Sequence, residues 1–326
     1  MIAAAGLVAY ASLLLGCGSP ALARAAWPAR APRLAIAAWL ALAWSAVTSI
    51  VLAGIALAIP VLPVRAGMAG LLTDCWTELR AQYAYPGGAA LAGAGAVLAV
   101  TVAARLAWYA GATLVGGARV SRRHRQGLRL AGRTDARLGA IVIDHAEPAA
   151  YCLAGRRQPV VLTSGALSVL DDAQVSAVLA HERAHQAGRH HLLVAAATAL
   201  AVALPGVPAF CRARDEVARL AELAADDVAA ARSPRLVVAN ALLTLGAAPA
   251  GAAALGAGGS TATARVRRLI AAPNPLGRVA AVGGAFAVAA MITFPVMILA
   301  EPAVAAVVAG NCSHPAVTVH VTAPHE

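Results

Sequence analysis

Residues 171–187 read DDAQVSAVLAHERAHQA, and this stretch determines how the rest of the chain is interpreted. The acidic residues Asp171 and Asp172 suit the first turn of a helix, because carboxylates there complement the positive end of the helix dipole. The apolar residues that follow continue this helix into an HExxH sequence at residues 181–185. We therefore predict one helix that carries both histidines of the motif.

The HExxH spacing points to a metal site. His181 and His185 are four residues apart, so both imidazoles lie on one face of the helix and can bind a single ion. Glu182 lies beside them and is the candidate catalytic base. Two imidazoles and a carboxylate, with one position left open, suit catalytic zinc, so we expect one Zn²⁺ per chain. The competing interpretation is a helix surface with solvated histidines.

A second predicted helix, residues 215–231, supplies the carboxylate. Its sequence Glu222-Leu-Ala-Ala-Asp226 places two acidic side chains on one face. Glu222 is the predicted third zinc ligand, and Asp226 would accept the second N–H of a ligand imidazole and fix its orientation. An exposed acidic helix face is the alternative, and the HExxH sequence upstream favours the metal site.

The composition is that of a membrane protein. Hydrophobic residues make up 60% of the chain and charged residues 13%, whereas soluble domains typically carry about 25% charged residues. Four segments are long and apolar enough to cross a bilayer: 2–22, 34–59, 88–117 and 278–300. A fifth segment, 192–210, is interrupted by prolines, and we interpret it as a re-entrant, interfacial or buried helix.

Arginine predicts the direction of these spans. The formal net charge is +11, and every positive side chain outside histidine is an arginine. Arginines gather in 24–33, 119–137 and 265–278, and loops rich in positive charge favour the cytoplasmic side. This pattern predicts a multi-pass protein of the cell membrane with both termini outside and the lipid bilayer as a partner. It also accounts for the basic run 119–137, so we expect no direct nucleic-acid binding.

HExxH followed by ExxxD in a chain with several spans resembles the integral-membrane gluzincin peptidases. The layout of three spans, a peptidase domain and one span is similar to the BlaR/MecR-type family. The stretch 160–167 leading into 179–185 is also typical of it. The resemblance implies zinc ligands at His181, His185 and Glu222, a base at Glu182 and a supporting carboxylate at Asp226.

This resemblance implies an enzyme, a zinc metalloendopeptidase that hydrolyses peptide bonds of a protein substrate at the cytoplasmic membrane face. Studied members of the family cleave a cytoplasmic transcriptional repressor or trigger its cleavage, so a repressor is the expected partner. Those members carry a large external penicillin-binding domain after the last span. Residues 301–326 are too short for one, so we do not expect the sensor function. The alternative is a non-catalytic membrane receptor or scaffold that retains the zinc-site fold.

The expected fold class is mainly α, a multi-span transmembrane helical bundle with a cytoplasmic α+β zincin-like domain. Short strands are predicted at 139–143 and 159–163, a further helix at 236–245 and a linker at 247–264. The expected domains are listed in chain order: 1–117 with three spans (2–22, 34–59 and 88–117), 118–277 as the cytoplasmic metallopeptidase domain, 278–300 as the fourth span, and 301–326 as an external tail.

Several other features leave alternatives open. By the resemblance, 159–163 would be an edge strand that pairs an extended substrate, or else an ordinary sheet strand. His190 and His191 would donate to the reacting oxygen or, as we favour, lie at the surface. Residues 14–23 contain sequences similar to export-processing sites, but no positive segment precedes them, so we favour a span. Cys75 and Cys312 would share a compartment, which leaves a disulfide between them as an open alternative that we do not favour. The tail histidines offer metal ligands, although a solvated tail is the better interpretation.

Overall fold

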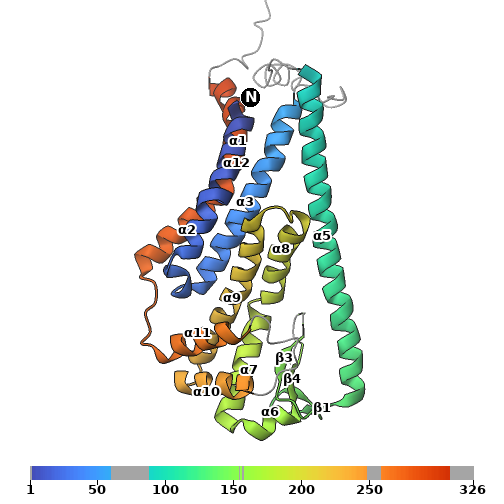
Figure 1. The fold of residues 1–326 in the computed structure, drawn as a ribbon, viewed down its shortest axis with the longest axis vertical. Coiled ribbons are helices and arrows are strands. Elements are labelled where there is room, and N and C mark those ends of the chain that lie inside the picture. The colour runs from blue at the N-terminus through green and yellow to red at the C-terminus, as the bar shows by residue number, and fades with distance from the viewer. Residues whose placement is uncertain (1, 60–87, 154, 156–157, 248–257, 309–326) are drawn as a thin grey trace, which may run out of the picture. The chain divides into compact units, whose positions relative to one another are not determined.

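The structure is a computed structural model that describes residues 2–59, 88–153, 155, 158–247 and 258–308 (Figure 1). Its longer helices and two short helical segments are, in chain order, α1 (Ile2–Leu13), η1 (Leu14–Gly18, a π-helix), α2 (Ser19–Arg24), η2 (Trp27–Ala29, 3-10), α3 (Pro32–Ala58), α5 (Gly88–Ala131), α6 (Ser164–Val169), α7 (Asp172–Ala187), α8 (His190–Ala203), α9 (Pro208–Ala230), α10 (Arg235–Ala247), α11 (Gly258–Ile270) and α12 (Arg278–Val308). The strands are β1 (Gly132–Asp135), β2 (Ala140–Ile143), β3 (Ala150–Cys152) and β4 (Val160–Thr163). The described chain is mostly helical, as expected.

Four helical segments are long and apolar enough to cross a membrane. They are Ile2–Arg24, Pro32–Ala58, Gly88–Ala131 and Arg278–Glu301. The last of these is hardly buried within the protein, and its large apolar side chains, including Phe286 and Met297, are exposed. Such exposure is favourable in lipid, so these segments are consistent with a membrane protein.

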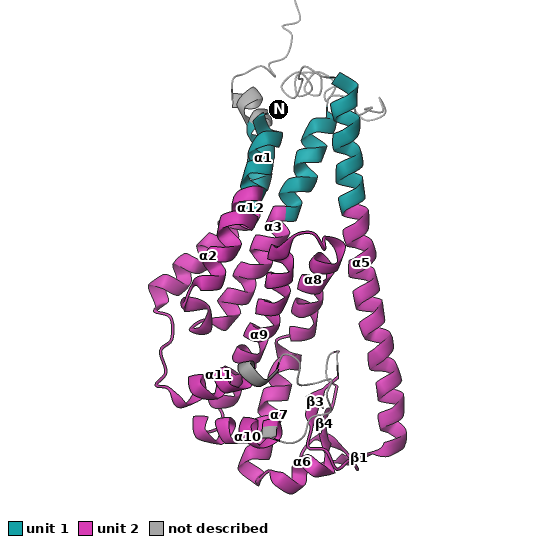
Figure 2. Ribbon diagram, in the orientation of Figure 1, with its two compact units in different colours: residues 1–11, 47–102, 293–326 teal, residues 12–46, 103–292 magenta. Residues whose placement is uncertain are grey.

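The chain divides into two compact units (Figure 2), one made of residues 1–11, 47–102 and 293–326 and the other of residues 12–46 and 103–292. Within the first unit, parts of α1, α3 and α12 pack through small and aliphatic side chains. Gly54 of α3 and Gly95 of α5 let their two backbones come close, because a Cβ on either would overlap the carbonyl oxygen of the other. Small residues allow this close packing between helices in membranes.

The structure differs from two expectations. The helix α5 continues beyond the predicted span 88–117 to Ala131, so most of the basic run lies on a helix rather than in a loop, while the membrane boundary of this span stays a prediction. Arginine is a good helix former and no proline interrupts this stretch. The predicted linker 247–264 also overlaps α11, which begins at Gly258; residues 248–257 lie outside the described residues.

The second unit contains a small mixed sheet with the strand order β1-β2-β4-β3. β1 and β2 are antiparallel, β2 and β4 are parallel, and β3 is antiparallel to β4. The predicted strands at 139–143 and 159–163 are therefore present as β2 and β4. Of the two alternatives for 159–163, the edge strand is wrong and the ordinary sheet strand is correct, because β4 pairs on both sides and β3 is an edge of the sheet.

The sequence of β4 explains its central place. All four of its residues are buried. Val160 and Leu162 contact α7, whereas Val161 packs on the other face of the sheet with Leu128 of α5. A strand covered on both faces is apolar at successive positions rather than at alternate ones. Pro159 lies before the strand, so its missing N–H removes no bond from the ladder.

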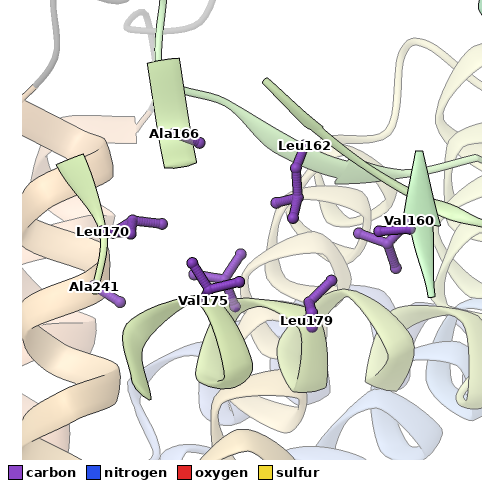
Figure 3. Packing of buried hydrophobic residues seen from close by; sticks show 9 residues of the cluster. Val160, Leu162, Ala166, Leu170, Val175, Leu179 and Ala241 are labelled. Carbon is purple, nitrogen blue, oxygen red and sulfur yellow. The ribbon is translucent and has the colours of Figure 1, made fainter. Parts of the chain in front are cut away.

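The helix α7 is fixed to this sheet by a hydrophobic cluster. Val175 and Leu179 project from α7 toward Leu162 and Val160, as Figure 3 shows. The helix begins with a capping box, in which the Asp171 side chain accepts from the N–H of Gln174 and the Gln174 side chain accepts from the N–H of Asp171. The predicted helix start is correct. The capping box holds the N-terminal end of α7 in place, and the hydrophobic cluster holds the face that packs on the sheet.

The apolar segment after α7 forms α8, which is 14 residues long and packs beside α9 (Figure 1). This length is short for a crossing, which takes about 20 residues. Arg105 of α5 donates from Nε to the carbonyl oxygen of Ala203 at 3.0 Å and so binds the end of α8. The following helix, α9, begins at Pro208 rather than near residue 215, because proline is well suited to the first turn.

Candidate active site

The side chains of His181, His185 and Glu222 meet where α7 packs against α9. Nε2 of His181 lies 3.1 Å from Nε2 of His185. The Glu222 oxygens are 3.5 Å from Nε2 of His181 and 3.3 Å from Nε2 of His185. The two imidazoles come from one helix and the carboxylate from another, as the spacing of the motifs predicts.

These donors fit a zinc ion. Each residue offers one ligand atom, and the three atoms lie within 4.8 Å of one another. In a tetrahedral site with zinc–ligand bonds of about 2.0–2.2 Å, neighbouring donors are about 3.3 Å apart. The two Nε2 atoms are 3.1 Å apart, and each lies 3.3 or 3.5 Å from a different oxygen of Glu222, so these separations are close to that value. Two nitrogens and a carboxylate oxygen are also ligands that zinc prefers.

Asp226 supports His181 from the side opposite Glu222. Its Oδ1 lies 3.1 Å from Nδ1 of His181. The ring N–H does not point directly at this oxygen. Burial disfavours a charged His181, but the carboxylates of Asp226 and Glu222 outweigh it and raise its pKa to about 9.

Arg265 of α11 binds both carboxylates of α9. Its Nη1 is 2.9 Å from Oε2 of Glu222, and its Nε and Nη2 donate to the two oxygens of Asp226 at 2.8 and 2.7 Å. Burial opposes ionisation of Asp226, but the bond to Arg265 outweighs this and holds its pKa at about 2. In the sequence, Arg265 is distinguished only as part of the arginine cluster at 265–278.

Glu182 lies beside the metal-ligand group and against the edge of the sheet. Its carboxylate accepts hydrogen bonds from the backbone N–H and the thiol of Cys152 in β3. Burial raises the pKa of Glu182 above its usual range. Burial and the nearby Glu182 charge raise the pKa of Cys152 to about 12, so this thiol stays protonated and able to donate. The role of Cys152 was not predicted, because its strand is far from the motif in sequence.

His190 contacts the second predicted ligand. Its Nδ1 lies 2.9 Å from Nδ1 of His185, and the ring is buried. The predicted surface position of His190 is therefore wrong. The signal missed was the turn after α7, which reverses the chain at Gly188 and Arg189 and brings His190 back onto the motif.

The other acidic residues of α9 have separate partners. Asp227 forms a two-pronged ion pair with Arg268 of α11, at 2.7 and 3.0 Å. Arg219, a candidate neighbour of Glu222 in an exposed acidic face, instead pairs with Glu216 at 2.7 Å. This division leaves Glu222 directed at the two histidines. Cys75, Cys312 and the tail histidines lie outside the described residues.

A cavity of about 590 Å³ opens beside Glu222 and His185. Its walls come from α5, α7, α8, α9 and the β3 region, and its lining combines apolar side chains such as Leu153 and Val194 with polar ones such as Gln186 and Thr198. A cavity next to the metal-ligand group offers space for a side chain of a bound peptide.

In this structure an HExxH helix packs on a small sheet and receives a carboxylate from a second helix. This arrangement is typical of HExxH metallohydrolases. A comparison with protein families agrees with this class: residues 118–224, about a third of the chain, match the model of peptidase family M48. The match covers the sheet, both histidines and Glu222, and it supports a metallopeptidase function for this part of the chain. Comparisons with curated proteins and with solved structures give no match.

Proposed function

We propose that this protein is a membrane-embedded zinc endopeptidase that hydrolyses peptide bonds of a protein substrate at the cytoplasmic membrane face. The observation that carries the proposal is the triangle of donor atoms from His181, His185 and Glu222, with Glu182 next to it. When bound there, zinc would supply a Lewis acid for the scissile carbonyl and make a water molecule easier to deprotonate.

Glu182 acts as the base in this proposal. Its carboxylate takes a proton from the attacking water, whose oxygen forms the new bond to the carbonyl carbon. The same carboxyl group then gives the proton to the leaving nitrogen as the C–N bond breaks. A pKa raised by burial suits this double role, because the group then exchanges protons more readily near neutral pH.

The free edge of β3 is the proposed docking place for the substrate backbone. Thr163 donates its N–H to the carbonyl oxygen of Ala149, and antiparallel pairs alternate, so Tyr151 faces β4 while Ala150 and Cys152 face the free edge. The bond from Cys152 N–H to Glu182 agrees with this direction. A peptide added as a new strand would therefore run past the base.

Regulatory proteolysis of a cytoplasmic transcriptional repressor is the proposed biological role. It rests on the similarity of the span layout and motifs to the BlaR/MecR-type family. The cytoplasmic location rests on the arginine distribution.

The test is the Glu182→Gln variant of the full-length protein. It keeps the shape of the side chain and removes the base, so cleavage of a peptide library should fall by about 10²- to 10⁴-fold while bound zinc is retained. Glu216→Gln is the matched control, because Glu216 pairs with Arg219 on the same helix as Glu222 and should leave cleavage unchanged. Full cleavage by Glu182→Gln would exclude this mechanism and favour a non-catalytic role.

A further inference from the structure

The turn between α7 and α8 has an unusual backbone that brings His190 close to the proposed metal site. Arg189 adopts a left-handed conformation, with φ 49° and ψ 38°. This conformation is unfavourable for a residue with a side chain, because its Cβ comes close to the following carbonyl oxygen. Gly188 precedes it, and a Cβ there would overlap Nε2 and Cδ2 of His190. The turn thus combines a strained residue with a glycine that the His190 ring covers.

The His190 ring meets His185 on the side away from Glu222. The two Nδ1 atoms are 2.9 Å apart, and the rings are nearly perpendicular, at 88° with centroids 4.8 Å apart. His190 is only 7% exposed. Only one of two facing ring nitrogens can carry the shared proton, so one Nδ1 donates this hydrogen bond and the other accepts it.

The direction of this hydrogen bond follows from the other end of His185. Nε2 of His185 faces Glu222 and His181 and is therefore its ligand atom. A neutral imidazole that offers Nε2 to an ion carries its proton on Nδ1. Nδ1 of His185 must then donate, and Nδ1 of His190 must accept. The arrangement parallels that of His181, whose Nδ1 faces Asp226.

We infer that His190 is a positioning residue of the metal site, which accepts a hydrogen bond from Nδ1 of His185 and keeps Nε2 of His185 directed at the ion. The inference rests on the proposed metal site. An imidazole thus supports the second ligand, while a carboxylate supports the first. Partners of this kind fix the orientation of a ligand and raise its basicity.

The test compares two substitutions of His190 in the full-length, detergent-solubilised protein. His190→Leu keeps apolar bulk and removes the acceptor, whereas His190→Asn is smaller but keeps an oxygen near the position of Nδ1. The measured quantities are the zinc dissociation constant, from competition with a chelator, and the absorption spectrum of the cobalt-loaded protein. His191→Leu is the matched control.

We expect His190→Leu to bind zinc about 10- to 100-fold more weakly and to change the cobalt spectrum. The zinc dissociation constant of His190→Asn should lie within a few-fold of that of the unmodified protein, because its acceptor is retained but less well placed. His191→Leu should bind zinc like the unmodified protein. A role in packing alone predicts the reverse order, with leucine better tolerated than asparagine. Unchanged affinity in His190→Leu, or an equal loss in His190→Asn, would overturn the inference while leaving the proposed function intact. Absence of zinc binding by the unmodified protein would overturn both.

Discussion

The carboxylates of Glu222 and Asp226 share a face of α9 and need a positive partner. Asp226 is fully buried, and Arg265 donates hydrogen bonds to it and forms an ion pair with Glu222. An uncompensated buried charge is strongly destabilising, so this arginine is an integral part of the site rather than a surface charge. Neither motif spacing nor charge counting identifies Arg265, because its contacts with Glu222 and Asp226 form only when α11 packs against α9.

The first prediction concerns this arginine. Arg265→Leu should lower the free energy of unfolding by about 3–5 kcal/mol, because it leaves the buried carboxylate of Asp226, and the partly exposed one of Glu222, without their cation. Arg265→Lys should lose less, since it keeps the charge but not the two-pronged geometry. Chemical denaturation in detergent measures both. Arg267→Leu is the control, as Arg267 is exposed on the same helix; an equal effect of the two leucine variants would contradict the prediction.

At the scale of elements, the helix carrying HExxH and the helix carrying ExxxD could be predicted from sequence, because their signals are local. Spacing places the histidines on one face, and acidic residues mark the helix start. Strand order could not be predicted in this way. An edge strand was one of two alternatives for 159–163, and the pairing of β4 with both β2 and β3 depends on contacts between distant segments. The roles of the site residues remain predictions.

The second prediction concerns the free edge of β3. Ala150→Pro removes an N–H that faces this edge and leaves the bonds to β4 in place, so kcat/KM for peptide substrates should fall by about 2- to 10-fold, as for one lost hydrogen bond. Ala150→Val, which keeps the N–H, is the control. Steady-state kinetics on one peptide series measures the difference, and equal values for the two variants would exclude docking of the substrate at this edge.

For the whole molecule, composition predicted the four long apolar helices, and the structure has helices of suitable length at those places. The boundaries were less predictable. Helical propensity alone allows α5 to continue through its arginines to Ala131, whereas hydropathy ends the span earlier. The direction of the spans stays a prediction that rests on arginine placement.

The third prediction tests this direction with reporter insertions in the full chain. An insertion after Gly206, in the turn between α8 and α9, should report the same side of the membrane as one at residue 247. An insertion at residue 75 should report the opposite side. If Gly206 and residue 247 report different sides, the chain crosses the membrane between them, and the proposed topology is wrong.

The central claim is that His181, His185 and Glu222 hold one metal ion, and the zinc content of purified protein tests it most directly. Elemental analysis of the unmodified protein and of Glu182→Gln should give about one zinc per chain, since the base is not a ligand. His185→Ala should lose most of it while remaining folded. Equal zinc in His185→Ala and the unmodified protein, or none in the unmodified protein after purification with zinc supplied, would contradict the account.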